Sequence, residues 1–126
     1  MSLGGRSRGD YSKQTQYSDA QMRLGSVLQR AGAIVEFESE IVREGEFTRE
    51  GRPKHYVLDL LVNGHLAVEV EGEGSASAGN EDRDIYLNVH GISVYHISNE
   101  RVKTHLQEEV AIILALARVK EVVAHA

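Results

Sequence analysis

The stretch His55–Glu71, HYVLDLLVNGHLAVEVE, decides the fold, because it reads as two strands joined by a tight turn at Asn63-Gly64. An Asn-Gly pair favours a two-residue hairpin loop, but that register would mix apolar and acidic side chains on both faces. A three-residue loop gathers the apolar side chains on one face: Tyr56, Leu58, Leu60, Val62, Leu66, Val68 and Val70. The opposite face then holds His55, Val57, Asp59, Leu61, Ala67, Glu69 and Glu71. Because a one-residue slip flips every side chain, burial predicts the three-residue loop.

This register places three carboxylates on one patch of the sheet. Glu69 and Glu71 are two positions apart on one strand, and Asp59 lies on the neighbouring strand, opposite Glu69 or one diagonal away. Mg²⁺ prefers oxygen ligands and takes one or two carboxylates together with water and phosphate. The hairpin alone therefore allows two interpretations. One is a Mg²⁺ site for phosphodiester hydrolysis, and the other, which these residues alone favour, is the solvated face of a two-sided hairpin.

Composition limits the class of protein. A chain of 126 residues is long enough for one domain with a core. It has no cysteine, so disulfides and thiolate metal sites are excluded and a cytoplasmic protein is expected. The longest apolar run, Val110–Ala117, is too short to cross a membrane. The net charge of −5 counts against broad DNA binding, although most basic residues lie in the first two thirds of the chain.

Before the hairpin, the sequence predicts a helix and a strand. Residues 1–16 are polar and lack periodicity, so we expect a flexible N-terminal segment followed by a single domain in residues 17–126. The capping box Ser18-x-x-Gln21 predicts the start of the helix. Residues 33–42 alternate as a strand, and residues 43–54 form a charged turn.

After the hairpin, small residues lead into a second helix from Asn80 or Glu81 to about His90, with Ile85 and Val89 predicted to face inward. The strand that follows, residues 92–97, is linked to the acidic strand through this helix. Such a right-handed crossover predicts that the two strands are parallel neighbours.

Asn99 is predicted to cap the last helix, which extends to about Val123. This helix is apolar on two sides, which indicates either deep burial or a dimer contact. The element order α-β-β-β-α-β-α predicts an α/β fold in which a mixed sheet is flanked by helices.

Several short motifs recur together in one known group. They are Asp59, the run Leu66-Ala67-Val68-Glu69-Val70-Glu71-Gly72, Arg83-Asp84-x-x-Leu87-x-x-x-Gly91-Ile92-x-Val94, and Asn99-Glu100-x-Val102. With these motifs the chain resembles the restriction-endonuclease-like PD-(D/E)XK superfamily from Ser18 to about Ala117. It is most similar to the branch of very short patch repair endonucleases and their small relatives. That branch replaces the superfamily lysine with an acid, which fits Glu71. The chain departs from the branch at Gln21, Ser75, Asn80 and His96, where Glu, His, Asp and Arg are usual.

The resemblance implies Mg²⁺-dependent cleavage of DNA, with Mn²⁺ as a possible substitute. Asp59 and Glu69 would hold the metal, with the carbonyl of Val70 as a further ligand. Glu71 would complete the site or orient the attacking water, and Gln21 would support catalysis from outside the metal's direct contacts.

Three basic residues are the expected DNA contacts. Arg83 would contact phosphate or neutralise Glu71, and Arg52 and Lys54 lie in the charged turn. His55 on the acidic face is either a proton carrier or an ordinary surface residue, and the second is the commoner case.

Three functions remain open from the sequence. The first is an active metal-dependent DNA endonuclease. The second is a nuclease-derived DNA-binding module that has lost its chemistry, which the changes at Gln21, Ser75 and Asn80 suggest. The third is an interaction domain of a homodimer or a larger multidomain protein, joined through the C-terminal helix.

Overall fold

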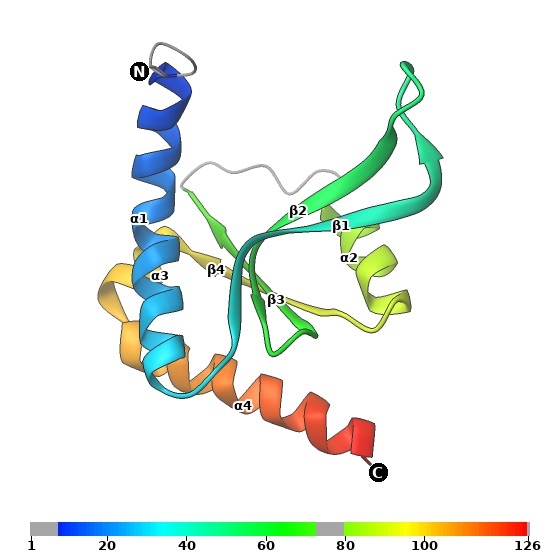
Figure 1. Ribbon diagram of the computed structural model, residues 1–126. Coiled ribbons are helices and arrows are strands. Elements are labelled where there is room, and N and C mark those ends of the chain that lie inside the picture. Colours follow the sequence, from blue (N-terminus) through cyan, green and yellow to red (C-terminus); the bar gives the residue numbers. More distant parts are fainter. Residues whose placement is uncertain (1–7, 73–79, 126) are drawn as a thin grey trace.

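The computed structural model describes residues 8–72 and 80–125, which form a four-stranded mixed sheet with helices on both faces (Figure 1). The elements are α1 (Arg8–Arg30), β1 (Val35–Phe47), β2 (Pro53–Val62), β3 (Leu66–Glu71), α2 (Asn80–Val89), β4 (Ser93–Ser98), α3 (Asn99–Thr104) and α4 (Leu106–His125). The strand order is β1-β2-β3-β4. The first three strands are antiparallel and β4 runs parallel to β3. The predicted α/β architecture and the parallel crossover are therefore confirmed.

The central hairpin has the predicted three-residue loop. Val62 pairs with Leu66 and Leu60 pairs with Val68, which leaves residues 63–65 in the turn. Asn63 and Gly64 both have positive φ, 53° and 77°, the conformation that this residue pair tolerates best. The Asn63 side chain also accepts a 2.9 Å hydrogen bond from the backbone of Ile34, so the turn is tied to the start of β1.

Two apolar clusters lie on opposite faces of the sheet. One packs β2, β3 and β4 against α1, α3 and α4, and includes Leu24, Leu60, Val68, Val102 and Ile113. The other lies under α2 and consists of Leu58, Leu61, Ala67, Leu87 and Ile92. Side chains of β3 point alternately into these two clusters, so nearly all of them are buried.

The prediction that Tyr56 and Leu58 share a face with Leu60 is wrong. Leu58 belongs to the cluster under α2, and the ring of Tyr56 lies 5.7 Å from that of Tyr86 on α2. The cause lies on β1, where Glu38 has a φ of 51° between two regular ladder pairs. A left-handed residue inside a strand increases the local twist, so both strands turn there and the earlier part of β2 faces α2.

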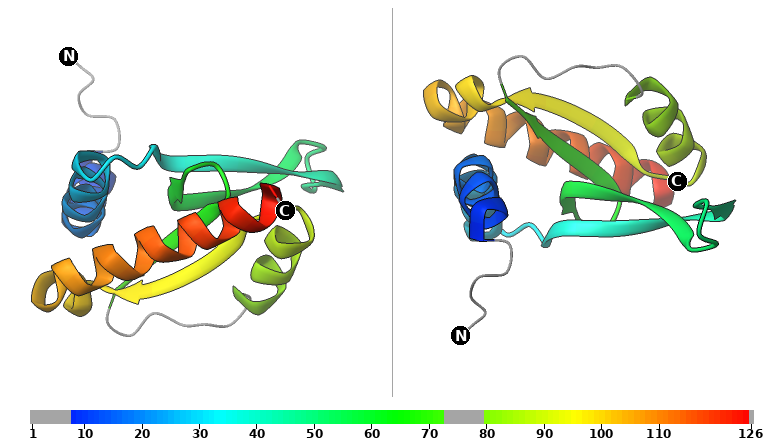
Figure 2. Two further views of the ribbon diagram at one scale, coloured as in Figure 1. Left: turned by 90° about the horizontal axis from the view of Figure 1, so that it is seen from below. Right: turned by 90° about the horizontal axis from the view of Figure 1, so that it is seen from above.

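The β1–β2 hairpin is longer than predicted. β1 continues to Phe47, which pairs with Pro53, so the turn contains only residues 48–52. The backbone N–H of Thr48 donates to the carbonyl of Arg52 at 2.7 Å and closes the turn. Figures 1 and 2 show this hairpin extending as an arm away from α1. Charged residues do not prevent strand pairing here, because the arm exposes one side of each strand.

Two helix predictions also need correction. α1 begins at Arg8, so Ser18 is not its cap, and residues 8–16 are helical although they carry no apolar stripe. On α2, Ile85 and Val89 are exposed by 57% and 75%, whereas Leu87 is buried. The inward face of α2 carries Leu87 together with charged residues that meet the sheet, and apolar periodicity cannot detect such a face.

The last predicted helix is divided in two. The cap of α3 is Ser98 and not the predicted Asn99, because Ser98 accepts a hydrogen bond from the backbone N–H of Arg101. His105 interrupts the helix before α4. Val102 of α3 and Val110 and Ile113 of α4 are buried in the core, and Leu106 packs against it while partly buried. Within residues 8–72 and 80–125, no helix combines the length and the hydropathy that a membrane span requires.

Candidate functional site

Asp59 of β2 and Glu69 of β3 lie against each other in the middle of the sheet. The backbone N–H of Asp59 donates to Oε2 of Glu69 at 3.1 Å, and the N–H of Val70 donates to Oδ2 of Asp59 at 2.8 Å. Each carboxylate therefore accepts a hydrogen bond from the backbone of the opposite strand. These two bonds lie just beyond the last regular ladder pair, Leu60 with Val68, so the acids join the strands where the ladder ends.

Both carboxyls are held in an environment that disfavours their charge. Glu69 is only 5% exposed, and its burial, followed by the nearby charge of Asp59, raises its pKa to about 7 despite the opposing effect of Arg83. Burial likewise raises the pKa of Asp59, although the hydrogen bond from Val70 and the charge of Arg83 partly offset it. A pair of this kind gains stability from any cation that reaches both carboxylates.

Arg83 projects from α2 toward this pair. Its guanidinium Nη2 lies 3.4 Å from Oε1 of Glu69, and its Nε lies 3.9 Å from Oδ1 of Asp84. The residue that Arg83 neutralises is thus Glu69, and not Glu71 as one of the two predictions had it. The side chain of Arg83 is only 17% exposed, and its buried Nε has no hydrogen-bond partner among the described residues.

Glu71 faces a histidine that the sequence analysis did not assign to the site. Nδ1 of His96 lies 2.5 Å from Oε2 of Glu71, and Nε2 lies 2.6 Å from Oδ2 of Asp84. Burial lowers the pKa of His96, but the hydrogen bonds to Asp84 and Glu71 and the charges of both outweigh that effect and raise it. His96 therefore connects β3 and α2 through two carboxylates.

The parallel pairing of β3 with β4 is the feature that could have predicted His96 at the site. The backbone of His96 pairs with Glu69, and Ser98 pairs with Glu71. The sequence predicted these neighbouring strands but not their register, so it could not place His96 beside the acids. Asp84 was missed because its helix was expected to turn an apolar face toward the sheet.

The remaining predicted residues form no hydrogen bond or ion pair with the acids within the described residues. Gln21 is 2% exposed, and its Nε2 has no hydrogen-bond partner among the described residues. His55, Arg52 and Lys54 are exposed on the β1–β2 arm. None of these four side chains makes a recorded contact with Asp59 or Glu69 in the described part of the chain.

The donor set suits a hard divalent cation. The buried carboxylate of Glu69 and the half-buried carboxylate of Asp59 offer oxygen ligands alone, which matches the preference of Mg²⁺. Among the described residues, however, no group of three or more His, Asp or Glu side chains is arranged to hold a metal. Glu71 is hydrogen-bonded to His96 instead, and the positive charge nearest Glu69 is that of Arg83.

The comparisons with known proteins assign no family. No protein-family model matches the chain, and no curated protein matches it significantly. Functional inference therefore depends on the chemistry of this site, because an α/β sheet flanked by helices supports many unrelated activities.

Proposed function

We propose that the protein is a Mg²⁺-dependent DNA endonuclease that hydrolyses phosphodiester bonds. One observation carries the proposal: Asp59 and Glu69 form a reciprocal pair whose pKa values are raised, and Glu69 is almost fully buried. A solvated face would leave both carboxylates in water at their ordinary pKa values. Holding acids in an unfavourable environment is typical of functional sites, where a ligand restores the balance of charge.

In this proposal, carboxylate oxygens of Asp59 and Glu69 hold the ion, with the carbonyl of Val70 as a further ligand. A bound Mg²⁺ supplies charge stabilisation for the phosphate and lowers the pKa of water. Its charge also replaces that of Arg83 beside Glu69, which leaves the guanidinium available for a phosphate oxygen. Arg52 and Lys54 would contact the DNA backbone outside the cut site.

Glu71 and His96 handle the proton. Glu71 lies two residues from Glu69 on the same strand, so it can orient the attacking water from the side of His96. Nδ1 of His96 is hydrogen-bonded to Oε2 of Glu71, and its Nε2 is hydrogen-bonded to Oδ2 of Asp84. Asp84 thus fixes the ring orientation, as carboxylates commonly do for functional histidines.

The test is nicking of supercoiled plasmid by the Asp59→Asn variant. The amide keeps the shape of the carboxylate but removes the charge that holds the ion, so we expect the nicking rate to fall on the order of 100-fold or more. DNA affinity measured in Ca²⁺ should be unchanged or tighter, because a negative charge beside a polyanion is lost. Glu40→Gln, an exposed acid on β1, is the matched control. An Asp59→Asn protein that nicks at the wild-type rate would falsify the proposal.

A second candidate is a DNA-binding module that has lost catalysis. The observation that favours it is the ion pair between Arg83 and Glu69, which already balances the buried charge without a metal. This candidate predicts DNA binding in Ca²⁺, no nicking in either Mg²⁺ or Mn²⁺, and a melting temperature that does not respond to these ions.

A further inference from the structure

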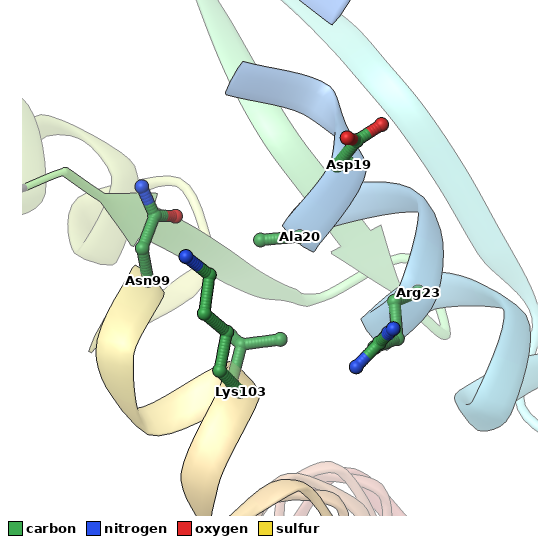
Figure 3. A pocket seen from close by; sticks show the side chains of 6 residues that line it. Asp19, Ala20, Arg23, Asn99 and Lys103 are labelled. Atoms are coloured by element: carbon green, nitrogen blue, oxygen red, sulfur yellow. The ribbon is translucent and has the colours of Figure 1, made fainter. Parts of the chain in front are cut away.

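A cavity of about 630 Å³ lies between α1 and α3, outside the acidic site. Its walls are formed by Asp19, Ala20 and Arg23 of α1 and by Asn99, Val102 and Lys103 of α3. Figure 3 shows Lys103 reaching into the space between the helices, with Asp19 and Arg23 on the opposite wall. The two helices thus place two cations and one carboxylate around a single hollow.

The polar groups of this cavity are not used by the fold. Neither Arg23 nor Lys103 takes part in an ion pair within the described residues. Oδ1 of Asn99 is buried and has no hydrogen-bond partner there. Since an amide oxygen only accepts hydrogen bonds, a donor such as the Lys103 ammonium or water would satisfy Oδ1, and this atom does not itself attract an anion. Two positive charges against one negative charge favour an anion.

The cavity is connected to the acidic strand by a second hollow of about 470 Å³. Asn99 and Lys103 line both spaces, and the second space also contains Glu71 and Gly72 at the end of β3. Lys103 thus lines both the space beside Glu71 and the cavity that holds Arg23, so a chain that occupied both spaces would pass both cations. The carboxylates would repel the phosphates of that chain, so cations on the same path are needed to hold it.

From these contacts we propose that the α1–α3 cavity binds a backbone phosphate of the DNA strand that enters the acidic site. The inference extends the proposed nuclease function by naming where the strand runs beyond the cut. Arg23 and Lys103 pair with the phosphate oxygens. Contacts of this kind fix the position of the strand and do not read its sequence.

The experiment measures binding of a fluorescent oligonucleotide in Ca²⁺ at several salt concentrations. For the double variant Arg23→Gln, Lys103→Gln, the slope of log affinity against log salt should become shallower by about one for each cation removed. Arg30→Gln, an exposed cation on the last turn of α1, is the matched control and should leave the slope unchanged. The charge-conserving variant Arg23→Lys, Lys103→Arg should restore it. Both substituted side chains are exposed, and unchanged melting curves verify the fold.

The outcomes separate this inference from the nuclease proposal. A shallower slope in a protein that never nicks plasmid supports the cavity and overturns the catalytic proposal. Normal nicking with an unchanged slope in the double variant overturns the cavity and leaves the catalytic proposal standing. In a third outcome, inorganic phosphate raises the melting temperature only when Arg23 and Lys103 are both present, whereas oligonucleotide affinity does not depend on them. The cavity then binds a small free anion, and its assignment to a DNA strand is wrong.

Discussion

Two buried glutamates on opposite faces of the sheet have pKa values that are shifted in opposite directions. Glu109 of α4 is 3% exposed and Glu69 of β3 is 5% exposed, so both side chains are buried. Oε1 of Glu109 accepts from the Tyr95 hydroxyl at 2.6 Å, and Oε2 accepts from Nε and Nη2 of Arg101 at 2.9 and 2.7 Å. Burial raises the pKa of Glu109, but these donors and the charge of Arg101 outweigh it and lower the pKa overall.

Glu69 has no comparable set of donors. It receives one backbone hydrogen bond and an ion pair of 3.4 Å, and it faces a second carboxylate. Its pKa therefore rises to about 7. The comparison teaches that burial alone does not identify a site. A buried carboxylate that its own fold satisfies joins β4, α3 and α4, whereas one that the fold leaves short of positive charge is suited to receive a ligand.

The largest expected effect is the loss of stability on changing Glu109 to Gln. The amide removes the charge that faces Arg101 and places N–H groups against existing donors, so we expect unfolding to become easier by about 3 kcal/mol. Thermal melting at pH 7 measures it. Glu108→Gln is the matched control, since Glu108 is 68% exposed and lies 3.7 Å from the same guanidinium. Equal effects of the two variants would contradict the structural role of Glu109.

Changing Glu69 to Gln should have the opposite sign and depend on pH. The raised pKa means that the folded protein holds the proton more tightly than the unfolded chain does. Stability is therefore lost as the pH rises from about 4.5, the ordinary value, through about 7. We expect Glu69→Gln to be more stable than wild type by roughly 3 kcal/mol at pH 8 and nearly equal to it at pH 4. Chemical unfolding at both pH values, with Glu40→Gln as control, measures the difference. A variant less stable than wild type at pH 8 would place Glu69 with Glu109 as a structural acid.

Divalent ions provide a third test of the same contrast. At ten times its dissociation constant, a bound ion stabilises the folded protein by about 1.4 kcal/mol, so millimolar Mg²⁺ or Mn²⁺ should raise the melting temperature. Glu69→Gln should abolish this shift, and Glu109→Gln should keep it on a lower baseline. If neither ion changes the melting temperature of the wild-type protein at low ionic strength, the support for a metal site is removed.

The smallest expected effect concerns Gln21. Its buried Nε2 lacks a partner among the described residues, and an unsatisfied buried amide costs about 1 kcal/mol or more. Gln21→Met keeps the volume and removes the polar group, so we expect a gain of about 1 kcal/mol in unfolding free energy and little change in nicking rate. A large loss of nicking with normal stability would show instead that the amide takes part in the reaction.

Local sequence determined much of the sheet. The alternation from Leu60 to Val70 predicted the three-residue loop against the two-residue loop that Asn63-Gly64 favours, because only the longer loop buries the apolar residues on one face. The crossover through α2 predicted that β3 and β4 are parallel, since a helix between two strands of one sheet allows little else. These features depend on periodicity and chain geometry within short stretches.

Only the tertiary structure decided which groups surround the acids. The left-handed Glu38 turned Leu58 toward α2, and no pattern in β2 itself records a twist that originates on its partner strand. His96, Asp84 and Arg83 reach the acids because α2 lies over β3 and β4 with its charged residues inward. Whether a buried carboxylate is satisfied depends on donors from elements far apart in the chain, and for Glu69 and Glu109 that difference arises only when those elements pack.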